Sequence, residues 1–312
     1  MSKRRLGRSE LMIEPLALGT NVIGGTIDEA RSFAVLDAFL AEGFTAIDTA
    51  DVYTRVNQPN SSEDIIGRWI KARGNRDKIV LMTKVGSDMG AGHRNLSEKY
   101  ILQAVEDSLR RLHTDYIDLY QTHFPDPAYK QDETLGAYEK LVAAGKVRVI
   151  GCSNFDTKLL SEALAISKAK GWPRYETLQN EYNLYAREPF EEVQALCVKE
   201  EVSGLHYFSL ARGFVTGKYR TEADASKSPR GPAVVQRYFN EKGFRILKAL
   251  DTVHERTGAA LAEIALAWLN AQPGTAAPIA SATSVEQVAE LARGARLTLS
   301  AEDLKLLTDA GR

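Results

Sequence analysis

Four side chains in the first half of the chain could together reduce a carbonyl group. Asp48, Lys84 and His123 each end a short apolar run of the kind that forms a strand, and Tyr53 lies in the loop beyond Asp48. Carbonyl reduction needs a hydride at carbon and a proton at oxygen. A tyrosine, with an ordinary pKa of about 10, is a reluctant donor at neutral pH. A nearby ammonium such as that of Lys84 lowers this pKa, because it favours the phenolate.

The other two residues complete this chemistry. An unpaired ammonium is costly in a desolvated pocket, so a carboxylate such as Asp48 is expected beside Lys84. His123 can donate a hydrogen bond to the carbonyl oxygen and orient it. Each residue type alone is common at a strand end for structural reasons, such as a local ion pair. The prediction therefore depends on all four together, in this order along the chain.

Short apolar runs, each the length of a strand, alternate along the chain with longer amphipathic stretches. Eight runs are predicted as strands, near Leu16–Leu18, Phe44–Ile47, Ile79–Met82, Tyr116–Tyr120, Val147–Ile150, Thr177–Gln179, Val202–Tyr207 and Ala277–Ala280. Helices are predicted between them, for example at Asp28–Glu42, Ser61–Arg73, Ser97–Leu112, Glu133–Ala144 and Thr157–Lys170. In the third of these helices Ile101, Val105 and Leu109 recur at helical spacing, and Ser97 is the expected N-cap.

Eight strand–helix alternations predict parallel strands, in an open doubly wound sheet or in a closed barrel. The open dinucleotide-binding fold carries a G-x-G-x-x-G motif after its first strand, which this chain lacks. We therefore predict an α/β fold with one domain over residues 1–312, a single (β/α)8 TIM barrel. An N-terminal β-hairpin around Gly7 and an extra C-terminal helix from Ser300 are added to it. Active sites of such barrels form at the C-terminal ends of the strands, where the four residues can converge.

The loops after the strands are expected to form the wall of the substrate pocket. The candidates are residues 56–61, 86–95 and 124–130 and the long segment from Arg212 to Val235, which has no clear period. Gly86, Gly90 and Gly92 suggest that the second of these loops moves. Aromatic and polar residues mix in the four segments, which suits an aldehyde, a sugar or a small ketone.

Composition argues against several other classes of function. The chain has 312 residues, 44% hydrophobic and 26% charged, and its formal net charge of -1 gives no reason to expect nucleic acid or a membrane as partner. No apolar run approaches the roughly 20 residues that span a bilayer, and the N-terminus lacks a signal peptide's apolar core, so a cytoplasmic location is predicted. Cys152 and Cys197 are predicted to be free thiols, and the five histidines form no H-x-x-x-H pair, so no metal site is predicted.

Three segments resemble signatures of the aldo-keto reductase family, namely Gly43–Tyr53, Met82–Lys84 and Gln121–His123. The similarity extends over nearly the whole chain. It implies a role for each of the four residues: general acid for Tyr53, modulator of its pKa for Lys84, partner of that lysine for Asp48, and orientation of the carbonyl for His123. The resemblance also implies a nicotinamide cofactor, which the spacing alone does not show.

The same resemblance implies which residues hold this cofactor. Ser153, Asn154 and Gln179 match side chains that hold the nicotinamide carboxamide, and Tyr207 matches the aromatic residue that stacks on its ring. Residues 209–219 resemble the loop that covers the pyrophosphate. The cofactor-binding residues implied in this way are Thr20, Ser153, Asn154, Gln179, Tyr207, Ser209, Leu210, Arg212, Gly213, Lys218, Ser281, Thr283 and Gln287.

Two of the chain's departures from the family pattern concern these cofactor-binding residues. Phe208-Ser209-Leu210 stands where the family often shows Ser-Pro-Leu. In the segment 278–287, relatives that prefer NADP(H) usually place an Arg or Lys against the 2′-phosphate, whereas this chain has Ser281, Thr283 and Gln287. Either the phosphate is reached instead by Arg212, Lys218 or Arg293, or the protein uses NAD(H). Both remain open, and family habit favours NADP(H).

The predicted function is that of an NAD(P)H-dependent carbonyl reductase or alcohol dehydrogenase, with Tyr53 as general acid and base. Its substrate is expected to be a small-molecule carbonyl or alcohol, and the oligomeric state is not predicted. Two alternatives stay open. The barrel could be a regulatory subunit that binds the cofactor and senses redox state without efficient turnover. Lys84 could instead form a Schiff base, as in barrel aldolases, although the pairing of Tyr53 with His123 disfavours this.

Overall fold

The structure is a computed structural model, and it describes residues 2–53 and 61–312. Its central feature is a closed barrel of parallel strands in the order β10-β3-β4-β5-β6-β7-β8-β9. These strands are β3 (Ala17–Gly19), β4 (Ala46–Asp48), β5 (Val80–Val85), β6 (Ile117–Thr122), β7 (Val147–Ser153), β8 (Tyr175–Glu181), β9 (Ser203–Tyr207) and β10 (Thr275–Ala280). The predicted (β/α)8 barrel is therefore confirmed.

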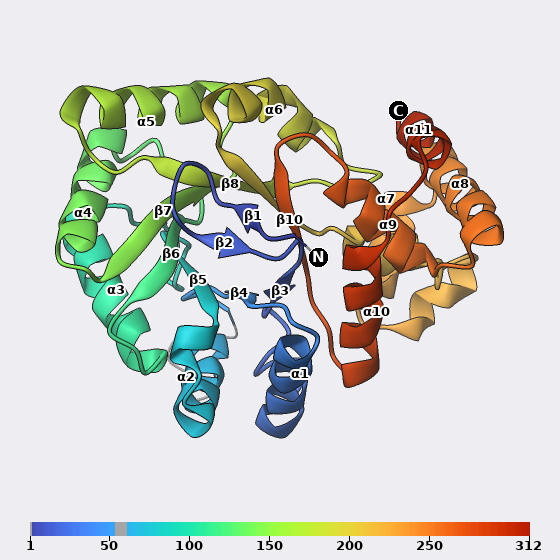
Figure 1. The fold of residues 1–312 in the computed structure, drawn as a ribbon, viewed down its shortest axis with the longest axis horizontal. Coiled ribbons are helices and arrows are strands. Elements are labelled where there is room, and N and C mark those ends of the chain that lie inside the picture. The colour runs from blue at the N-terminus through green and yellow to red at the C-terminus, as the bar shows by residue number, and fades with distance from the viewer. Residues whose placement is uncertain (1, 54–60) are drawn as a thin grey trace.

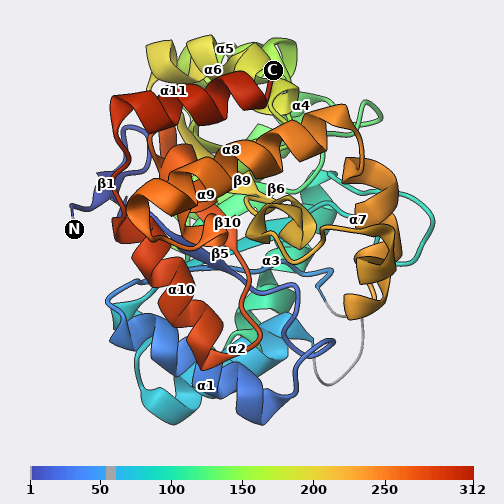
Figure 2. The ribbon, with the colours of Figure 1, turned by 90° about the vertical axis from the view of Figure 1, so that its right-hand side faces the viewer.

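Helices surround this barrel on the outside (Figure 1). Those that follow single strands are α1 (Glu29–Ala41), α2 (Ser62–Arg73), α3 (Glu98–Arg111), α4 (Gln131–Ala143), α5 (Thr157–Lys170), α6 (Glu188–Glu200) and α10 (Val285–Arg296). The connection from β9 to β10 is longer and holds α7 (Gly231–Tyr238), α8 (Glu241–Thr257) and α9 (Leu261–Asn270). The predicted C-terminal helix is α11 (Ala301–Ala310), which packs along α8 (Figure 2).

Local sequence explains why these helices form and where they begin. In α3, the predicted stripe of Ile101, Val105 and Leu109 is buried against the barrel. The Ser97 hydroxyl accepts a hydrogen bond from the backbone N–H of Tyr100, so the predicted N-cap is confirmed. Helix α2 ends at Gly74, whose φ of 58° lies in the left-handed region that favours glycine.

The N-terminal hairpin closes one end of the barrel. Strands β1 (Arg4–Arg5) and β2 (Met12–Ile13) pair antiparallel and lie across the middle of the ring (Figure 1). Leu6 and Ile13 are fully buried in the apolar cluster that fills the barrel interior. The backbone N–H of Gly7 donates to the hydroxyl of Ser203, the first residue of β9. Since the hairpin covers the N-terminal ends of the strands, the site must lie at the opposite mouth.

Two of the differences between the predicted and the observed elements bear on the site. Strand β7 was expected to end at Ile150 but extends to Ser153, so the Gly-Cys-Ser sequence belongs to the strand and not to the loop after it. The segment from Arg212 to Val235 was expected to be irregular. It holds two 3₁₀ helices, Ala211–Thr216 and Glu222–Lys227, and the beginning of α7. Elements this short contain too few turns to show a helical period in the sequence.

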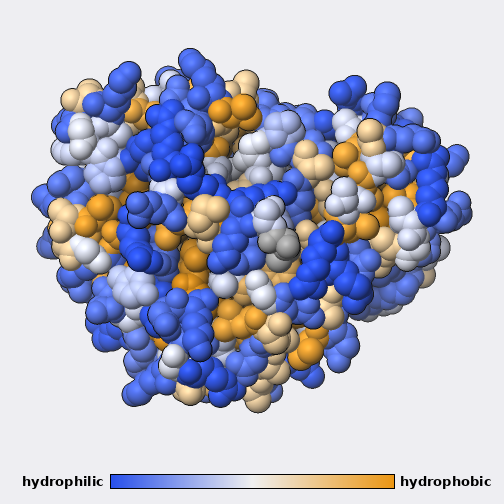
Figure 3. Space-filling model, viewed as in Figure 1, coloured by the Kyte–Doolittle hydropathy of each residue, from blue (hydrophilic) through white to orange (hydrophobic). Residues whose placement is uncertain are grey.

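No helix within the described residues is both long enough and apolar enough to cross a membrane. The surface at the hairpin end is mostly hydrophilic, with apolar residues at scattered positions (Figure 3). Scattered apolar residues are normal on a protein surface, so this face does not by itself indicate a docking site.

Candidate active site

Lys84 is the central residue of the site at the open mouth. Its ammonium donates three hydrogen bonds: to Asp48 Oδ2 at 2.7 Å, to the backbone carbonyl of Thr49 at 2.7 Å and to the hydroxyl of Tyr53 at 3.2 Å. An ammonium has three N–H donors, so all of them are used. Because the Tyr53 oxygen accepts from Lys84, the phenol hydrogen remains available to point into the mouth.

The backbone places Tyr53 over Lys84 through a tight turn after β4. The N–H of Thr49 donates to the carbonyl of Met82 at 2.8 Å, and the N–H of Asp51 donates to the carbonyl of Lys84 at 3.3 Å. The N–H of Tyr53 then donates to the carbonyl of Ala50 at 3.1 Å. These bonds tie the turn to β5, so the position of Tyr53 is set by the strand that carries Lys84.

Burial and nearby charges shift the pKa values of Lys84 and Tyr53 in opposite directions. Burial alone lowers the pKa of Lys84, but Asp48 and Tyr53 outweigh it and the pKa is raised, so the ammonium stays charged. Burial raises the pKa of Tyr53 above its ordinary value, although Lys84 acts to lower it. The sequence therefore predicted the direction of the lysine's own effect and missed the larger effect of burial. A charged Lys84 with every donor occupied is a poor nucleophile, which argues against Schiff-base chemistry.

His123 lies one residue beyond β6, beside the tyrosine. Its ring centroid is 6.0 Å from that of Tyr53, in an edge-to-face arrangement, and 4.7 Å from that of Phe124, on which it stacks. Burial, helped by the charges of Lys84 and Arg94, lowers the pKa of His123 well below its usual range. A neutral imidazole at neutral pH can donate one hydrogen bond but is not a charged acid. This leaves Tyr53 as the proton donor of the pair.

Asp48 is held from inside the barrel by two amides. Its Oδ1 accepts from Gln179 Nε2 at 3.0 Å and from Gln121 Nε2 at 3.4 Å, while its Oδ2 bonds Lys84. Gln121 was not predicted as a site residue. The signal was its position two residues before His123, because residues two apart in an extended chain project to the same side. The amides keep the carboxylate satisfied and fixed toward Lys84.

Ser153, Asn154 and Tyr207 meet at the ends of β7 and β9. The Tyr207 hydroxyl donates to Asn154 Oδ1 at 2.7 Å, and Asn154 Nδ2 donates to the carbonyl of His123 at 2.9 Å. The Ser153 hydroxyl donates to the carbonyl of Gln179 at 2.6 Å. Asn154 has a φ of 61°, an unusual backbone conformation that asparagine tolerates better than most residues. The structure thus brings the predicted carboxamide-binding residues together, with their polar atoms bonded to one another.

The loop after β9 has an unusual backbone. Phe208, Ala211 and Arg212 have φ values of 51°, 47° and 56°, in the left-handed region. The residue after Phe208 is Ser209, whose hydroxyl donates to the carbonyls of His206 and Ile279, so its side chain serves the fold. Leu210, the next predicted residue, is half-buried between the two large apolar clusters. Such strained loops persist where the surrounding structure holds them, often at ligand sites.

Two cations project from this loop, as the resemblance implies. The Arg212 guanidinium lies 4.1 Å from the centre of the Phe208 ring, and its buried Nε has no hydrogen-bond partner within the described residues. The end of the Lys218 side chain lies against Gly213, where even a Cβ atom would be in tight contact. A buried N–H donor without a partner is costly, which fits an anionic group that binds here.

The remaining residues predicted to bind the cofactor lie at the end of β3 and after β10. Thr20 is buried at the end of β3, and its hydroxyl donates to the carbonyl of Asp48. After β10, the Ser281 hydroxyl donates to Asn21 Oδ1, and Thr283 donates to the side-chain oxygen of Gln287. Of the cations considered for a 2′-phosphate, Arg293 is paired with Glu263 at 2.6 Å. Arg293 is therefore already committed to a carboxylate.

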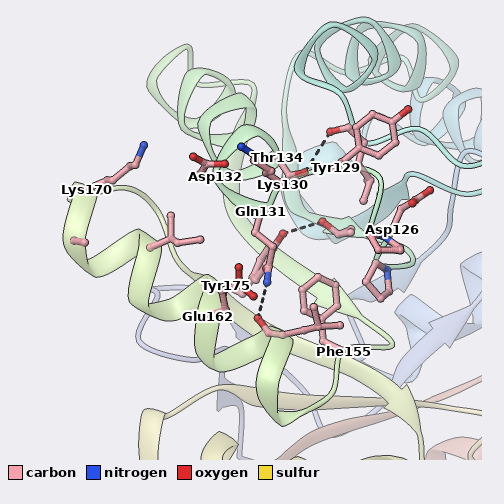
Figure 4. Close-up of a pocket in the computed structure, with 17 residues that line it drawn as sticks. Asp126, Tyr129, Lys130, Gln131, Asp132, Thr134, Phe155, Glu162, Lys170 and Tyr175 are labelled. Atoms are coloured by element: carbon pink, nitrogen blue, oxygen red, sulfur yellow. Dashed lines mark hydrogen bonds between the residues drawn. The ribbon is translucent and has the colours of Figure 1, made fainter.

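The loops predicted to line the substrate pocket divide between two places. Residues 56–60 lie outside the described residues. Phe124 faces the site through its contact with His123, whereas Pro125, Asp126 and Tyr129 line a separate cavity of about 870 Å³ between α4 and α5 (Figure 4). None of the four catalytic candidates lines that cavity. In the loop 86–95, the Asp88 carboxylate accepts from the N–H groups of Gly90 and Gly92, and the movement of this loop stays a prediction.

Comparison with known proteins finds similarity over nearly the whole chain. The model of the Aldo/keto reductase family matches residues 15–312. Aldo-keto reductase YhdN of Bacillus subtilis (strain 168) is 35% identical over 300 residues, covering 93% of this chain and 87% of that protein. The aryl-alcohol dehydrogenase (NADP+) of Phanerodontia chrysosporium is 31% identical over 326 residues, covering 96% and 83%. The crystal structure of the thermostable aldo-keto reductase Tm1743 with the inhibitor epalrestat superposes with a TM-score of 0.81 at 30% identity, covering 100% of both chains.

Proposed function

The chain belongs to the aldo/keto reductase family and is an NAD(P)-dependent oxidoreductase, and from this premise we propose that it reduces aldehydes, sugars or small ketones with Tyr53 as the general acid. The observation that carries this proposal is the contact between the ammonium of Lys84 and the oxygen of Tyr53, at 3.2 Å. In the reverse direction the same residue would act as general base on an alcohol.

The nicotinamide cofactor supplies the hydride when it is bound. Tyr53 keeps its proton at neutral pH, because burial raises its pKa. It can still protonate the oxygen of the substrate, since an alkoxide is a far stronger base than a phenolate. The ammonium of Lys84 stabilises the negative charge that develops on the phenol oxygen as the proton leaves. His123 would orient the carbonyl by one hydrogen bond, and Asp48 would keep Lys84 in place.

The residues at the mouth fit a nicotinamide nucleotide. Tyr207 presents a partly buried ring beside Asn154, which would hold the carboxamide together with Ser153 and Gln179. The side chains of Tyr207, Asn154 and Ser153 now bond one another, and the amide of Gln179 bonds Asp48 and Gln121. Binding would exchange some of those bonds for bonds to the cofactor. The Nε of Arg212, which has no hydrogen-bond partner in the described part of the chain, and the ammonium of Lys218 would meet the pyrophosphate. Thr20, Ser209, Leu210, Ser281, Thr283 and Gln287 remain proposed contacts.

A panel of carbonyl substrates tests this function. We expect purified protein with NADPH to reduce at least one aldehyde, sugar or small ketone with repeated turnover, followed by the loss of NADPH absorbance. Oxidation of only one equivalent of NADPH per protein would contradict the proposal and support the regulatory alternative. The complete set of Asp48, Tyr53, Lys84 and His123 does not favour that alternative.

NADP(H) is the proposed cofactor. We expect the Arg212→Gln variant to bind both NADPH and NADH more weakly, by about tenfold or more, because a charged contact to the shared pyrophosphate is lost. We also expect the wild-type protein to show a higher kcat/KM with NADPH than with NADH. Dissociation constants from quenching of protein fluorescence, with initial rates for both nucleotides, check these expectations.

Arg220→Gln is the matched control for this variant. Arg220 lies in the same segment but pairs with Asp251 on α8, with contacts of 2.7 and 2.8 Å. Its substitution should leave the affinities for NADPH and NADH unchanged. A loss confined to NADPH would mean that Arg212 contacts the 2′-phosphate and not the pyrophosphate. A kcat/KM of the wild-type protein that is tenfold higher with NADH than with NADPH would refute the choice of NADP(H). The cytoplasmic location expected from the sequence remains a prediction.

A further inference from the structure

A buried carboxyl group that the proposed mechanism does not use lies two residues before the catalytic tyrosine. Asp51 is 4% exposed, and neither of its carboxyl oxygens has a hydrogen-bond partner within the described residues. The backbone N–H of Val52 lowers the pKa of this carboxyl, but less than burial raises it. Buried carboxylates are almost always paired or fully hydrogen-bonded, so this arrangement needs an explanation.

The cations near Asp51 are already committed to other carboxylates. Lys84 uses its three donors on Asp48, Thr49 and Tyr53. Arg111 pairs with Glu63 at 2.7 Å, and Glu63 is completely buried. Several ionisable groups interact electrostatically with Asp51. They are Glu63 on α2, Tyr100 and Arg111 on α3, Tyr138 on α4, Lys84 on β5, Tyr120 on β6 and Tyr53 in the turn itself. Arg111 and Lys84 therefore compensate a negative charge on Asp51 only in part, because each of them is paired with another carboxylate.

The same turn carries the catalytic tyrosine. The N–H of Asp51 donates to the carbonyl of Lys84, the residue whose ammonium contacts Tyr53. An ionised Asp51 would draw Lys84 toward itself or turn outward to reach water. Either movement displaces Tyr53 from the ammonium, because the N–H of Tyr53 is bonded within this turn, to Ala50.

We propose that Asp51 is a positioning residue, which holds Tyr53 in place over Lys84 only while its carboxyl group carries a proton. This inference rests on the proposed reductase function. Burial, with a smaller contribution from Glu63, raises the pKa of Asp51 to about 8. The other groups at the site titrate elsewhere, since the pKa of His123 is lowered well below 6.5 and the pKa values of Tyr53 and Lys84 are raised above 10.0 and 10.5. A loss of activity near pH 8 is therefore a signature of Asp51.

The test is the pH profile of kcat for carbonyl reduction at saturating NADPH and substrate. We expect the wild-type kcat to fall about tenfold between about pH 7 and pH 9, with unchanged affinity for NADPH, because about nine-tenths of Asp51 is ionised one unit above its pKa. In the Asp51→Asn variant the side chain has nearly the same shape and does not ionise, so kcat should remain constant over this pH range. Asp37→Asn, at an exposed pair with Arg73, is the matched control and should keep the wild-type profile.

Infrared spectroscopy tests the protonation state without turnover. A protonated, buried carboxyl gives a separate C=O stretch, which should be present in the wild-type protein at neutral pH, disappear around pH 8 and be absent from Asp51→Asn. Absence of this band at neutral pH would overturn the proposal even if the variant fails to fold. An alkaline loss of kcat that persists in folded Asp51→Asn would overturn it as well. A normal infrared titration in a protein that turns over no carbonyl would instead refute the proposed function, and with it any positioning role.

Discussion

The Tyr53→Phe variant is expected to lose carbonyl reduction by about 10² to 10⁴-fold in kcat, the range that a positioned general acid contributes. The substitution removes one oxygen atom and leaves the ring, so the edge-to-face contact with His123 at 6.0 Å is kept. Neutral His123 cannot replace the lost acid, because its pKa lies well below neutrality. Initial rates with the best substrate of the panel, measured from about pH 6 to pH 9, check this prediction.

Nucleotide binding supplies the control for this variant. The hydroxyl of Tyr53 is not among the proposed contacts to the nucleotide. The dissociation constant for NADPH should therefore change by less than about twofold, a difference below 0.5 kcal/mol. Tyr185→Phe is a matched substitution. Within the described residues the Tyr185 hydroxyl bonds the carbonyl of Arg237 on α7 and no residue of the tetrad, so this variant should keep normal turnover. If Tyr53→Phe retained wild-type kcat, another group would have to donate the proton and the proposed mechanism would be refuted.

The Lys84→Met variant is expected to lose both activity and stability. Without the ammonium, kcat should fall by about 10² to 10³-fold, as when one preorganised donor to a developing negative charge is removed. The free energy of unfolding should fall by about 3–5 kcal/mol, because Asp48, which is 1% exposed, keeps a buried charge without its cation. Urea unfolding followed by circular dichroism, together with initial rates, measures the two effects.

A double variant separates the two roles of Lys84. Asp48→Asn combined with Lys84→Met removes the unpaired charge, so it should recover part of the lost free energy of unfolding while activity stays low. The amides of Gln121 and Gln179, which bond Asp48 Oδ1 at 3.4 and 3.0 Å, can still bond the asparagine oxygen. Recovery of activity in the double variant would contradict the role given to the ammonium. A fully stable Lys84→Met single variant would show that the two amides alone can hold the buried carboxylate.

The order and type of most elements were determined by the sequence by itself. The periods of apolar residues are local properties, set by 3.6 residues per helical turn and by the alternation of a strand. They predicted α5 at Thr157–Lys170 with both ends correct. They also placed Asp48, Lys84 and His123 at or beside strand ends, because a polar residue that follows an apolar run is itself a local signal. The segment from Arg212 to Val235 was expected to be irregular, because the helices in it have too few residues to show a period.

Only the tertiary structure decided what these residues do to one another. Closure of the barrel pairs Lys84 with Gln121 and Ser153 with Gln179. This register brings the amide of Gln121, which the sequence did not predict as a site residue, to Asp48 inside the barrel. Burial then raises the pKa of Tyr53, although the sequence showed only the lysine that lowers it. Desolvation and the distance between charges depend on the whole fold, because they sum over neighbours far apart in the chain. For the same reason, no sequence pattern could show that the carboxyl of Asp51 is buried without a hydrogen-bond partner among the described residues.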